Sequence, residues 1–418
     1  MGCCFENTLH YSSPAHGDWG VVRVGMLAPE SFQLFVCPFA CGRHGAIGAI
    51  KQGFKDRLAY LYISQSDIIS GYDDQIFEAV EQLLCNLYPC PKVFFIFVSC
   101  LDDLIGTDHE ALVETLSGRF PNIHFRVCHM NPISLDSELP PPVSIQNNLY
   151  SLLETLGEQD AGINSIGNLV AISPESELHY FLKLLGVKKL RHISKYQTFL
   201  DYQEMACSRG NLVLSPAGLQ AAQQMQERLG TPYLFEPVSY SIEAIEKAYS
   251  RIARFLRSEE EIYLDFSREK DQAVKAIQSA REKIGNIPII VDASAVMLPF
   301  GLARALLEYG FTVARVEAQK CIPIDRENME WLSANHPEVD VQQPQHHQAV
   351  LFDRRLKDSV AIGIDGAYLA GSRYVVDLFG DEGMFGFYGI CKLMARLEQA
   401  VEAPADLEQL INGYGLVV

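Results

Sequence analysis

Runs of apolar residues alternate with segments of helical spacing along the whole chain. In the first part, four apolar runs rich in β-branched and aromatic residues predict buried parallel strands at 31–39, 57–64, 92–100 and 122–130. Residues 73–88 and 109–120 carry helical spacing, and Thr107 with Glu110 predicts a capping box before the second helix. Strand, helix and strand in succession imply right-handed βαβ units and an open doubly wound sheet.

The same scheme recurs twice. Pro140-Pro141-Pro142 is a stiff break, and a helix is expected at 147–157. A second set of strands is predicted at 162–173, 189–194, 210–215 and 231–238, with helices at 175–187 and 217–230 and a long helix from Ser241 to about Ile284. A third set has strands at 286–294, 311–318, 359–365 and 373–380, with helices at 300–310 and 386–401. We expect an α/β fold of three Rossmann-like doubly wound parallel-sheet domains, with boundaries at 1–160, 161–285 and 286–418.

Composition narrows the class of protein. The chain is 48% hydrophobic, and 34 basic against 52 acidic residues give a net charge of −18. Charge of this sign repels nucleic acid and anionic membranes, so neither is expected as a partner. No apolar stretch reaches the roughly 18 residues that span a membrane, and no secretory signal is recognisable. We expect a cytoplasmic protein whose 11 cysteines are reduced thiols or metal ligands.

Five cysteines lie where ligands bind in such folds. Ligands of open α/β sheets bind beyond the carboxyl ends of the strands. Cys37 and Cys41 follow the first predicted strand and Cys100 ends the third, so both loops are expected at one edge of one sheet. Adding Cys3 or Cys4 from the N-terminal arm gives three or four thiolates, which favour an iron–sulfur cluster or zinc. The alternative is that these cysteines are buried small hydrophobes.

Three acidic residues follow the last of these cysteines. Asp102, Asp103 and Asp108 are candidates for proton delivery or for support of the ligands of a cluster. Asp108, at a predicted helix start, is equally explained by the helix dipole.

Several segments carry motifs in a characteristic order: FVCPFACGRHGAIGA, SDIISGYDDQIFEAVEQLL, FVSCLDDLIGTDHEAL, NLVLSPAGLQAAQQMQERLGTPYLFEPVSYSIEAI, VDASAVMLPFGLARALLEYGFTV and GMFGFYGICKLMARL. In this order they resemble the nitrogenase component 1 superfamily over nearly the whole chain. The superfamily includes the molybdenum–iron protein subunits, cofactor-assembly scaffolds, dark-operative protochlorophyllide reductase and other nitrogenase-like reductases. No single motif is as specific as a P-loop, but their order and spacing together are distinctive.

The resemblance implies which cysteines are ligands. Cys41 matches the family's second cluster cysteine, in the loop usually written HGPxGC, and Cys100 matches the third. The first matches Cys3 or Cys4, with Cys4 taken as the metal ligand, and Cys37 is either an extra ligand or a buried thiol. The implied cofactor is an iron–sulfur cluster, 4Fe–4S or a larger P-cluster-like one, shared at a subunit interface.

Two positions depart from the catalytic molybdenum–iron subunit. Its cofactor-anchoring cysteine matches Ser215 here, and its cofactor-binding histidine matches Phe385. A hydroxyl and a phenyl ring do not replace those ligands, so a dinitrogen-reducing subunit is not expected. No catalytic residue is assigned.

The resemblance implies a subunit of a nitrogenase-like reductase, an oxidoreductase component that acts on an unidentified substrate. It would take electrons from an ATP-dependent iron protein and pair with a homologous component 1 subunit, as a homo- or heterodimer or a heterotetramer. The chain has no P-loop, so no ATP site is expected in it. A scaffold for metallocofactor assembly, a noncatalytic partner subunit and an interaction module with unused cysteines are the alternatives.

Overall fold

The structure, a computed structural model, describes residues 9, 11, 13, 20–130, 140–155, 157–256, 265–351 and 356–414. The described residues divide into two compact units. The two-sheet unit is drawn from Asp18–Ala171 and Lys189–Phe235, and the one-sheet unit from Met1–Gly17, Ile172–Lys188 and Glu236–Val418. All three sheets are parallel throughout, which confirms the expected fold class. None of the described helices is both long and apolar enough to cross a bilayer.

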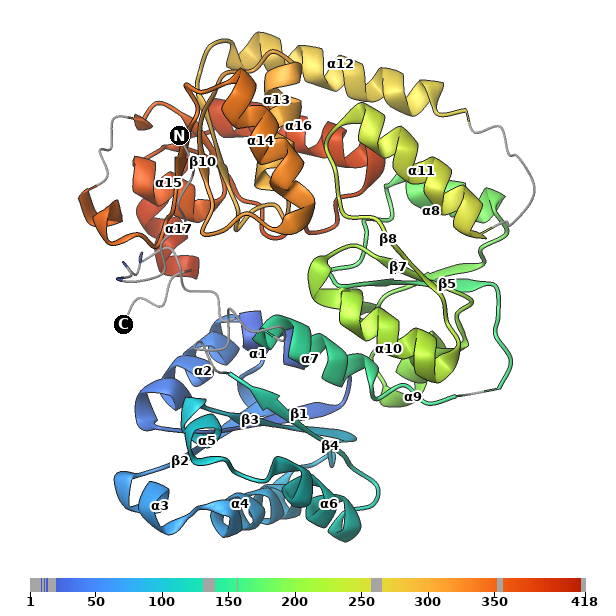
Figure 1. The fold of residues 1–418 in the computed structure, drawn as a ribbon, viewed down its shortest axis with the longest axis vertical. Coiled ribbons are helices and arrows are strands. Elements are labelled where there is room, and N and C mark those ends of the chain that lie inside the picture. The colour runs from blue at the N-terminus through green and yellow to red at the C-terminus, as the bar shows by residue number, and fades with distance from the viewer. Residues whose placement is uncertain are drawn as a thin grey trace. The chain divides into compact units, whose positions relative to one another are not determined.

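The first sheet has the strand order β2-β1-β3-β4 (Figure 1). Its strands are β1 Ser31–Cys37, β2 Leu58–Tyr62, β3 Val93–Val98 and β4 His124–His129. Its helices are α1 Gly20–Met26, α2 Phe39–Lys51, α3 Gln65–Ser70, α4 Asp73–Asn86, α5 Cys100–Ile105, α6 His109–Arg119 and α7 Pro141–Tyr150.

Alternation along β1 builds a core on each face of the first sheet. Phe35 and Cys37 face a core formed with α1 and α7, whereas Leu34 and Val36 face a second core formed with α4 and α6. Figure 1 shows α1, α2 and α7 on one face of the sheet and α4 and α6 on the other. Because both faces are covered, the strands are continuous apolar runs rather than alternating ones.

The second sheet has the order β6-β5-β7-β8, the same pattern as the first. Its strands are β5 Gly162–Ile166, β6 Lys189–Arg191, β7 Asn211–Val213 and β8 Tyr233–Phe235, and its helices are α9 Phe199–Tyr202 and α10 Leu219–Leu229.

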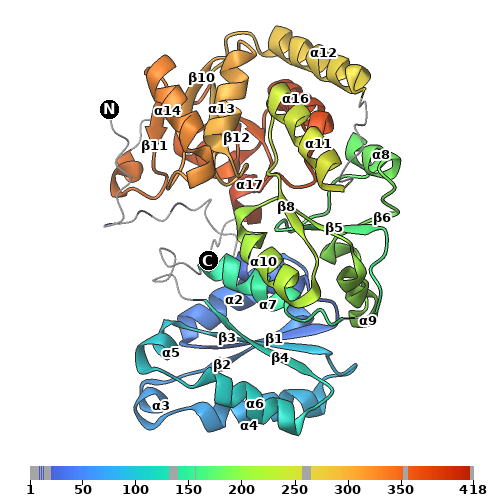
Figure 2. The ribbon, with the colours of Figure 1, turned by 45° about the vertical axis from the view of Figure 1, so that its right-hand side comes forward.

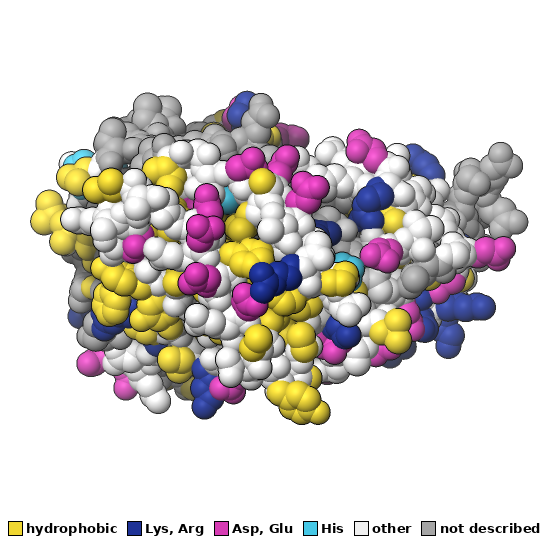
Figure 3. Space-filling model, turned by 90° about the horizontal axis from the view of Figure 1, so that it is seen from below, with side chains coloured by type: hydrophobic (Ala, Val, Ile, Leu, Met, Phe, Trp, Pro, Cys, Tyr) yellow, Lys and Arg dark blue, Asp and Glu magenta, His cyan; other side chains and the backbone are white. Residues whose placement is uncertain are grey.

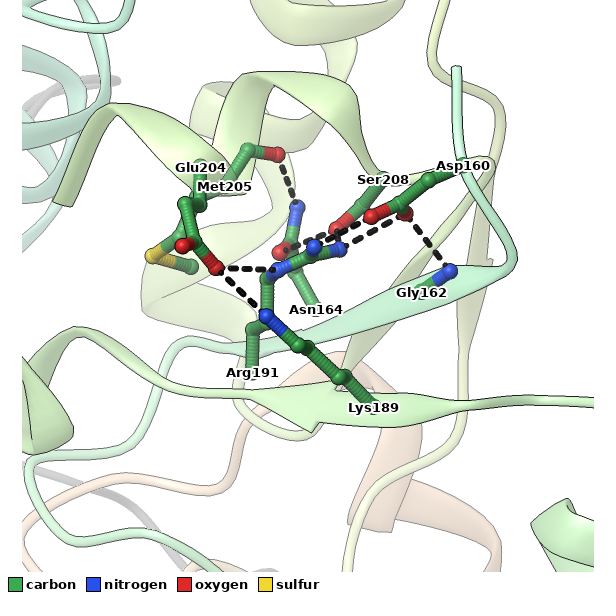
Figure 4. Close-up of polar contacts among 8 residues, drawn as sticks. All are labelled: Asp160, Gly162, Asn164, Lys189, Arg191, Glu204, Met205 and Ser208. Atoms are coloured by element: carbon green, nitrogen blue, oxygen red, sulfur yellow. Dashed lines mark hydrogen bonds and ion pairs between the residues drawn. The ribbon is translucent and has the colours of Figure 1, made fainter. Parts of the chain in front are cut away.

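A polar network holds the short edge strand β6 to β5 (Figure 4). The Arg191 guanidinium, whose side chain is 4% exposed, donates to both oxygens of Asp160 and to Ser208 Oγ. Ser208 Oγ in turn donates to Asn164 Oδ1 at 2.8 Å. A Cβ at Gly162 would lie 1.8 Å from Arg191 Nη1, so the guanidinium occupies space that only glycine leaves free. The three-residue strand β6 is thus held against β5 by side-chain hydrogen bonds as well as by its backbone.

The third sheet forms the core of the one-sheet unit, in the order β11-β10-β9-β12-β13. Its strands are β9 Ile289–Asp292, β10 Val313–Glu317, β11 Asp340–Gln342, β12 Val360–Ile362 and β13 Tyr374–Val376. The unit's helices are α8 Glu177–Leu184, α11 Ile242–Leu256, α12 Ser267–Ile284, α13 Pro299–Glu308, α14 Arg326–Asn335, α15 Ile364–Ala370, α16 Gly386–Glu402 and α17 Leu407–Tyr414. Figure 2 shows α13 beside α14, and α12 along α16.

Three local predictions were wrong. Pro140-Pro141-Pro142, predicted as a stiff break, leads into α7, because proline fits the first turn of a helix, where its missing N–H is not needed. The long helix predicted from Ser241 is not continuous, since Asp265 and Phe266, which precede α12, are not helical. The N-cap of α6 is Asp108 rather than Thr107, with Asp108 Oδ1 accepting from Ala111 N at 3.0 Å.

Candidate functional site

The described cysteines of the predicted site lie at one edge of the first sheet. Cys37 is the last residue of β1, and Cys41 lies in the first turn of α2, which follows it. Cys100 opens α5 directly after β3, with Ser99 as the N-cap. Because β1 and β3 are neighbours, with Val36 opposite Val98, their carboxyl ends meet. This is the switch point of the sheet, where the strand order reverses and ligands bind in open α/β folds.

Cys41 lies on a helix, whereas the sequence predicted a loop. A Cβ at Gly42 would come within 2.5 Å of the Tyr60 ring, so glycine here lets α2 pack closely against β2. The helix fixes the Cys41 thiol relative to the sheet edge more firmly than a loop would.

The three thiols are close enough to influence one another's ionisation. Burial raises the pKa of the Cys41 thiol, and the neighbouring Cys100 thiol raises it further. Burial, then Cys41, then the carboxylate of Asp102 raise the pKa of Cys37 to about 12. A cation among them would reverse this trend, because it stabilises thiolates. The edge is therefore suited to thiolates that share a positively charged centre.

Cys37 differs from the other two thiols in its surroundings. It is 0% exposed and packs within the apolar core beneath β1, where Cys41 contacts the rim of the same core. Cys41 and Cys100 are only partly buried. A fully buried thiol among apolar side chains behaves as a small hydrophobe, so Cys37 has a packing role that needs no metal.

Cys3 and Cys4 lie outside the described residues. Within the described ranges, no group of three or more Cys, His, Asp or Glu side chains is arranged to hold a metal ion. Cys41 and Cys100 are soft, partly accessible donors of the kind that iron–sulfur clusters take, so they fit such a cluster chemically. The described residues offer part of a ligand set, which other ligands would have to complete.

The switch point of the second sheet is closed by backbone. Gly167 follows β5 and Ser215 follows β7, on neighbouring strands. A Cβ at Gly167 would lie 3.0 Å from the Ser215 backbone, and one at Gly218 would lie 2.7 Å from Gly167 Cα. Ser215 is 3% exposed and its Oγ accepts from Ala217 N, as the cap of the short helix Pro216–Gly218. The hydroxyl is used for capping, and the residues at this edge do not fit a nitrogenase-type cofactor.

Phe385 also has a purely structural role. It is 3% exposed, precedes α16 as its N-cap, and packs edge-on against Tyr249 with ring centroids 6.1 Å apart. The Glu177 carboxylate accepts hydrogen bonds from Phe387 N at 2.6 Å and Tyr388 N at 3.0 Å. The first backbone N–H groups of α16 therefore have their hydrogen-bond acceptor within the chain. The side chain of Phe385 has no atom that could bind a metal.

The switch point of the third sheet carries carboxylates instead of thiols. Asp292 ends β9, and its oxygens accept from Ser294 N and Gly366 N, each at 2.8 Å. Burial and the neighbouring Asp365 raise the pKa of Asp292 to about 6. Burial raises the pKa of Glu317, which ends β10, to about 8. These are hard oxygen donors, with Asp292 bound to backbone N–H groups and Glu317 beside the Arg315 guanidinium, so this edge does not resemble the thiol edge.

The pair Asp102 and His109 lies near the thiols, and the sequence had singled out only Asp102. Asp102, two residues after Cys100, is 1% exposed, and its Oδ1 lies 3.5 Å from His109 Nε2. The position of Asp102 beside Cys100 was visible in the sequence. His109 was not singled out, because nothing in the sequence shows that the start of α6 folds back over α5.

Comparisons with known proteins identify the family and the fold of the chain. Residues 19–402 match the model of a family described as Nitrogenase component 1 type Oxidoreductase. The chain is 22% identical over 381 residues to the "Nitrogenase iron-molybdenum cofactor biosynthesis protein NifE" of Bradyrhizobium diazoefficiens, covering 82% of this chain and 64% of that protein. It is 23% identical over 286 residues to the protein of the same name from Sinorhizobium fredii, covering 64% and 55%. The chain thus spans less than two thirds of the length of these two relatives.

A solved structure shares the fold. The structure titled "Nitrogenase Cp1 at pH 6.5" superposes with a TM-score of 0.73 at 13% identity, covering 95% of this chain and 94% of that one. At that identity the likeness concerns the architecture of the three sheets alone.

Proposed function

The chain belongs to the family of nitrogenase component 1 type oxidoreductases, and we propose that it is a cluster-holding subunit of a nitrogenase-like reductase. The observation that carries the proposal is the pair Cys41 and Cys100 at the switch point of the first sheet. These two thiols, completed by Cys4 or Cys3 and by a second subunit, would hold an iron–sulfur cluster. When bound, such a cluster relays single electrons.

The residues of this chain would bind and shield the cluster rather than perform the substrate chemistry. Ser215 caps a helix and Phe385 lies in a core, so neither provides a second metallocofactor with a ligand. The substrate would then be reduced elsewhere in the assembly. The sequence has no P-loop of its own, so the ATP-dependent step would belong to a separate iron protein. That partner would deliver the electrons, and the proposed compartment is the cytoplasm.

Exposed apolar side chains near the thiol edge support a subunit partner. Phe39 at the start of α2 is 58% exposed, and its ring contacts that of Tyr62, which is 54% exposed. Ile105, at the end of α5, is 45% exposed. Figure 3 shows hydrophobic side chains gathered toward the α3 side of the face that carries α3, α4 and α6. Apolar surface of this kind is typical of interfaces, and a homologous subunit is the proposed occupant.

A scaffold for metallocofactor assembly is the second candidate. The two relatives described above favour it, because both are named as cofactor biosynthesis proteins. A scaffold would hold a cluster at the same thiols but pass metal and sulfide on to another protein. The two functions therefore use the same cysteines and differ in whether electrons or metal and sulfide leave the protein.

The test is iron and acid-labile sulfide analysis with EPR on anaerobically purified protein. We expect a cluster in the wild type, in Cys37→Ala and in the control Cys85→Ala, which removes an exposed thiol of α4. Cys41→Ala and Cys100→Ala should lose most of the iron and the signal. A colourless wild-type protein after anaerobic reconstitution would disprove the proposal.

Turnover then separates the two candidates. Protein supplied with an iron protein, a reductant, ATP and candidate substrates should consume the reductant in repeated cycles, as a substrate is reduced, if the chain belongs to a reductase. If the chain is a scaffold, metal and sulfide should transfer in one stoichiometric step to an acceptor protein, without continued electron consumption.

A further inference from the structure

Strand β2 lies at one edge of the first sheet, because it pairs with β1 alone. Ile63, which follows β2, donates its N–H to Cys37 O of β1. Since backbone groups alternate in direction along a strand, those of Leu58, Tyr60 and Tyr62 point outward, away from β1. Among the residues that the structure describes, none gives these outward N–H and C=O groups a hydrogen-bond partner.

This edge lacks the protection that the other edge strands have. An open strand edge is a template for pairing with another chain, and proteins usually protect it by charge, by proline or by a short strand. β2 has the five residues LAYLY, with no charge and no proline. By contrast, β6, β8, β11 and β13 have three residues each, and β4 carries Arg126. β2 is therefore the edge at which pairing with another chain is expected.

The sequence of β2 is complementary to a second copy of itself. If two β2 strands pair antiparallel about a two-fold axis at Tyr60, Tyr60 meets its own copy and Leu58 meets Tyr62. These are all outward residues, so each pair exchanges both backbone hydrogen bonds. Tyr60 and Tyr62, which are 38% and 54% exposed, would be covered by aromatic and aliphatic cross-strand neighbours. On the opposite face Ala59 meets Leu61, a small side chain against a large one.

The charges that flank β2 also suit a second copy. At the amino end of β2, Lys55 and Arg57 outweigh Asp56, whereas Asp67 is the only charged residue in the stretch 63–70 at its carboxyl end. Antiparallel pairing brings the amino end of one strand to the carboxyl end of the other, so opposite charges meet at both ends. This matters in a chain whose net charge of −18 opposes self-association.

We propose that a second copy of this chain pairs with β2, so that the first sheets of two copies join into one sheet across a two-fold axis at Tyr60. The inference goes beyond the proposed function and does not depend on a cluster. Because the paired strands run antiparallel, the thiol edges of the two copies lie at opposite ends of the joined sheet. The two copies would share no cluster, and the subunit that completes each thiol edge would bind as a further partner.

The test is sedimentation velocity of the full chain as a series of concentrations. Tyr60→Pro and its matched control Tyr60→Ala both lose the ring, but only proline loses the outward N–H at the two-fold axis. An edge strand tolerates proline whose nitrogen faces outward, so Tyr60→Pro should fold, which circular dichroism checks. We expect its dimer dissociation constant to be at least about tenfold above that of Tyr60→Ala, because both copies lose the donor.

Two results would overturn the inference: a wild type that stays monomeric up to about 100 µM, or a dimer equally stable in Tyr60→Pro and Tyr60→Ala. Repeating the comparison in Cys100→Ala, which should carry little iron, separates the two proposals. The effect of Tyr60→Pro should be the same there. A wild type without a cluster would overturn the proposed function and leave this interface standing.

Tyr60→Lys covers the case in which proline prevents folding. It keeps every backbone N–H and sets two positive charges opposite each other at the axis, which disfavours pairing. The dimer should be at least about tenfold weaker than that of Tyr60→Ala at low salt, and the difference should shrink at high salt. A dimer of unchanged stability in Tyr60→Lys would count against the inference.

Amide hydrogen exchange tests the strand pairing itself. In the wild-type dimer the outward amides of Leu58, Tyr60 and Tyr62 should exchange slowly, and dilution to the monomer should speed their exchange. The amides of Ala59 and Leu61, which point to β1, should stay protected at every concentration. Fast exchange of the three outward amides in a sample that sediments as a dimer would place the contact elsewhere and overturn the inference.

Discussion

The first and second sheets of the two-sheet unit share one strand order, but their switch points differ. In the first, β1 and β3 lead into helices that carry Cys41 and Cys100, both partly exposed. In the second, the loops after β5 and β7 press backbone against backbone, and Ser215 is used as a cap. Topology therefore decides where a site can form, and only the residues at that edge decide whether one does.

The contact between Gly218 and Gly167 tests most directly whether the switch point of the second sheet, unlike that of the first, is closed by backbone. Gly218→Ala would place a Cβ 2.7 Å from Gly167 Cα, so the two loops would have to separate. We expect the free energy of unfolding to fall by about 3 kcal/mol or more, as for severe overpacking. Urea unfolding followed by circular dichroism measures it.

The control for this substitution is Gly118→Ala on α6, where an added Cβ meets nothing within 4 Å. It should stabilise the protein by about 0.5–1 kcal/mol, because alanine favours the helix. Similar effects of both substitutions would show that the second switch point is not closed by contact.

The edge of the second sheet also depends on the network in Figure 4. Asp160→Ala leaves the buried guanidinium of Arg191 with Glu204 Oε2 at 3.8 Å as its remaining carboxylate. We expect a loss of about 1.5 kcal/mol, since a charged hydrogen bond is removed but Asp160 itself is half exposed. Urea unfolding at pH 7 measures it, and Asp358→Ala, which removes an exposed partner of Arg373, should have little effect.

This loss should depend on pH in a definite direction. Hydrogen bonds from Arg191 lower the pKa of Asp160 in the folded protein below its ordinary value near 3.8. Its contribution to stability is therefore present above that value and disappears as the pH falls through the folded pKa. The difference between wild type and Asp160→Ala should shrink below about pH 4. A difference that stays constant down to pH 2 would contradict the ion pair.

The contrast between the two sheets was only partly readable from the sequence. Apolar runs identified the strands and hence the carboxyl edges, because burial on both faces leaves a strong local signal. The placement of Cys41 on α2 was missed, since FACGRHGAIG contains three glycines and reads as a loop, and only packing against Tyr60 explains Gly42. The start of α7 was missed because proline marks a break and a first helical turn alike.

Contacts distant in sequence were beyond such reasoning. The approach of Gly218 to Gly167 joins loops that are 51 positions apart, and no local pattern announces it. The same holds for the pairing of His109 with Asp102, which depends on how tightly α6 folds back on α5. Periodicity reports which face of an element is buried, but not which side chain meets it there.

Ser215 tests whether the second switch point is structural. Ser215→Ala removes the hydroxyl that accepts from Ala217 N, and loss of such a cap costs about 1 kcal/mol. Urea unfolding should show that loss, while the iron content of the anaerobic protein should stay that of the wild type. A loss of iron in Ser215→Ala would mean that the second sheet also holds metal, and the contrast between the sheets would fail.

The smallest effects are expected at the thiols themselves, in metal-free protein. Cys41 and Cys100 are partly exposed, so replacing either by alanine should change the free energy of unfolding by no more than about 0.5 kcal/mol. Cys37→Ala should cost about 1 kcal/mol, because the thiol is 0% exposed and its removal leaves a cavity beside Phe35. Iron content should rank the three in the reverse order, with the large losses at Cys41 and Cys100. If Cys37→Ala lost the iron while Cys41→Ala kept it, Cys37 would be the ligand and Cys41 the packing residue, and the first switch point would have to be reassigned.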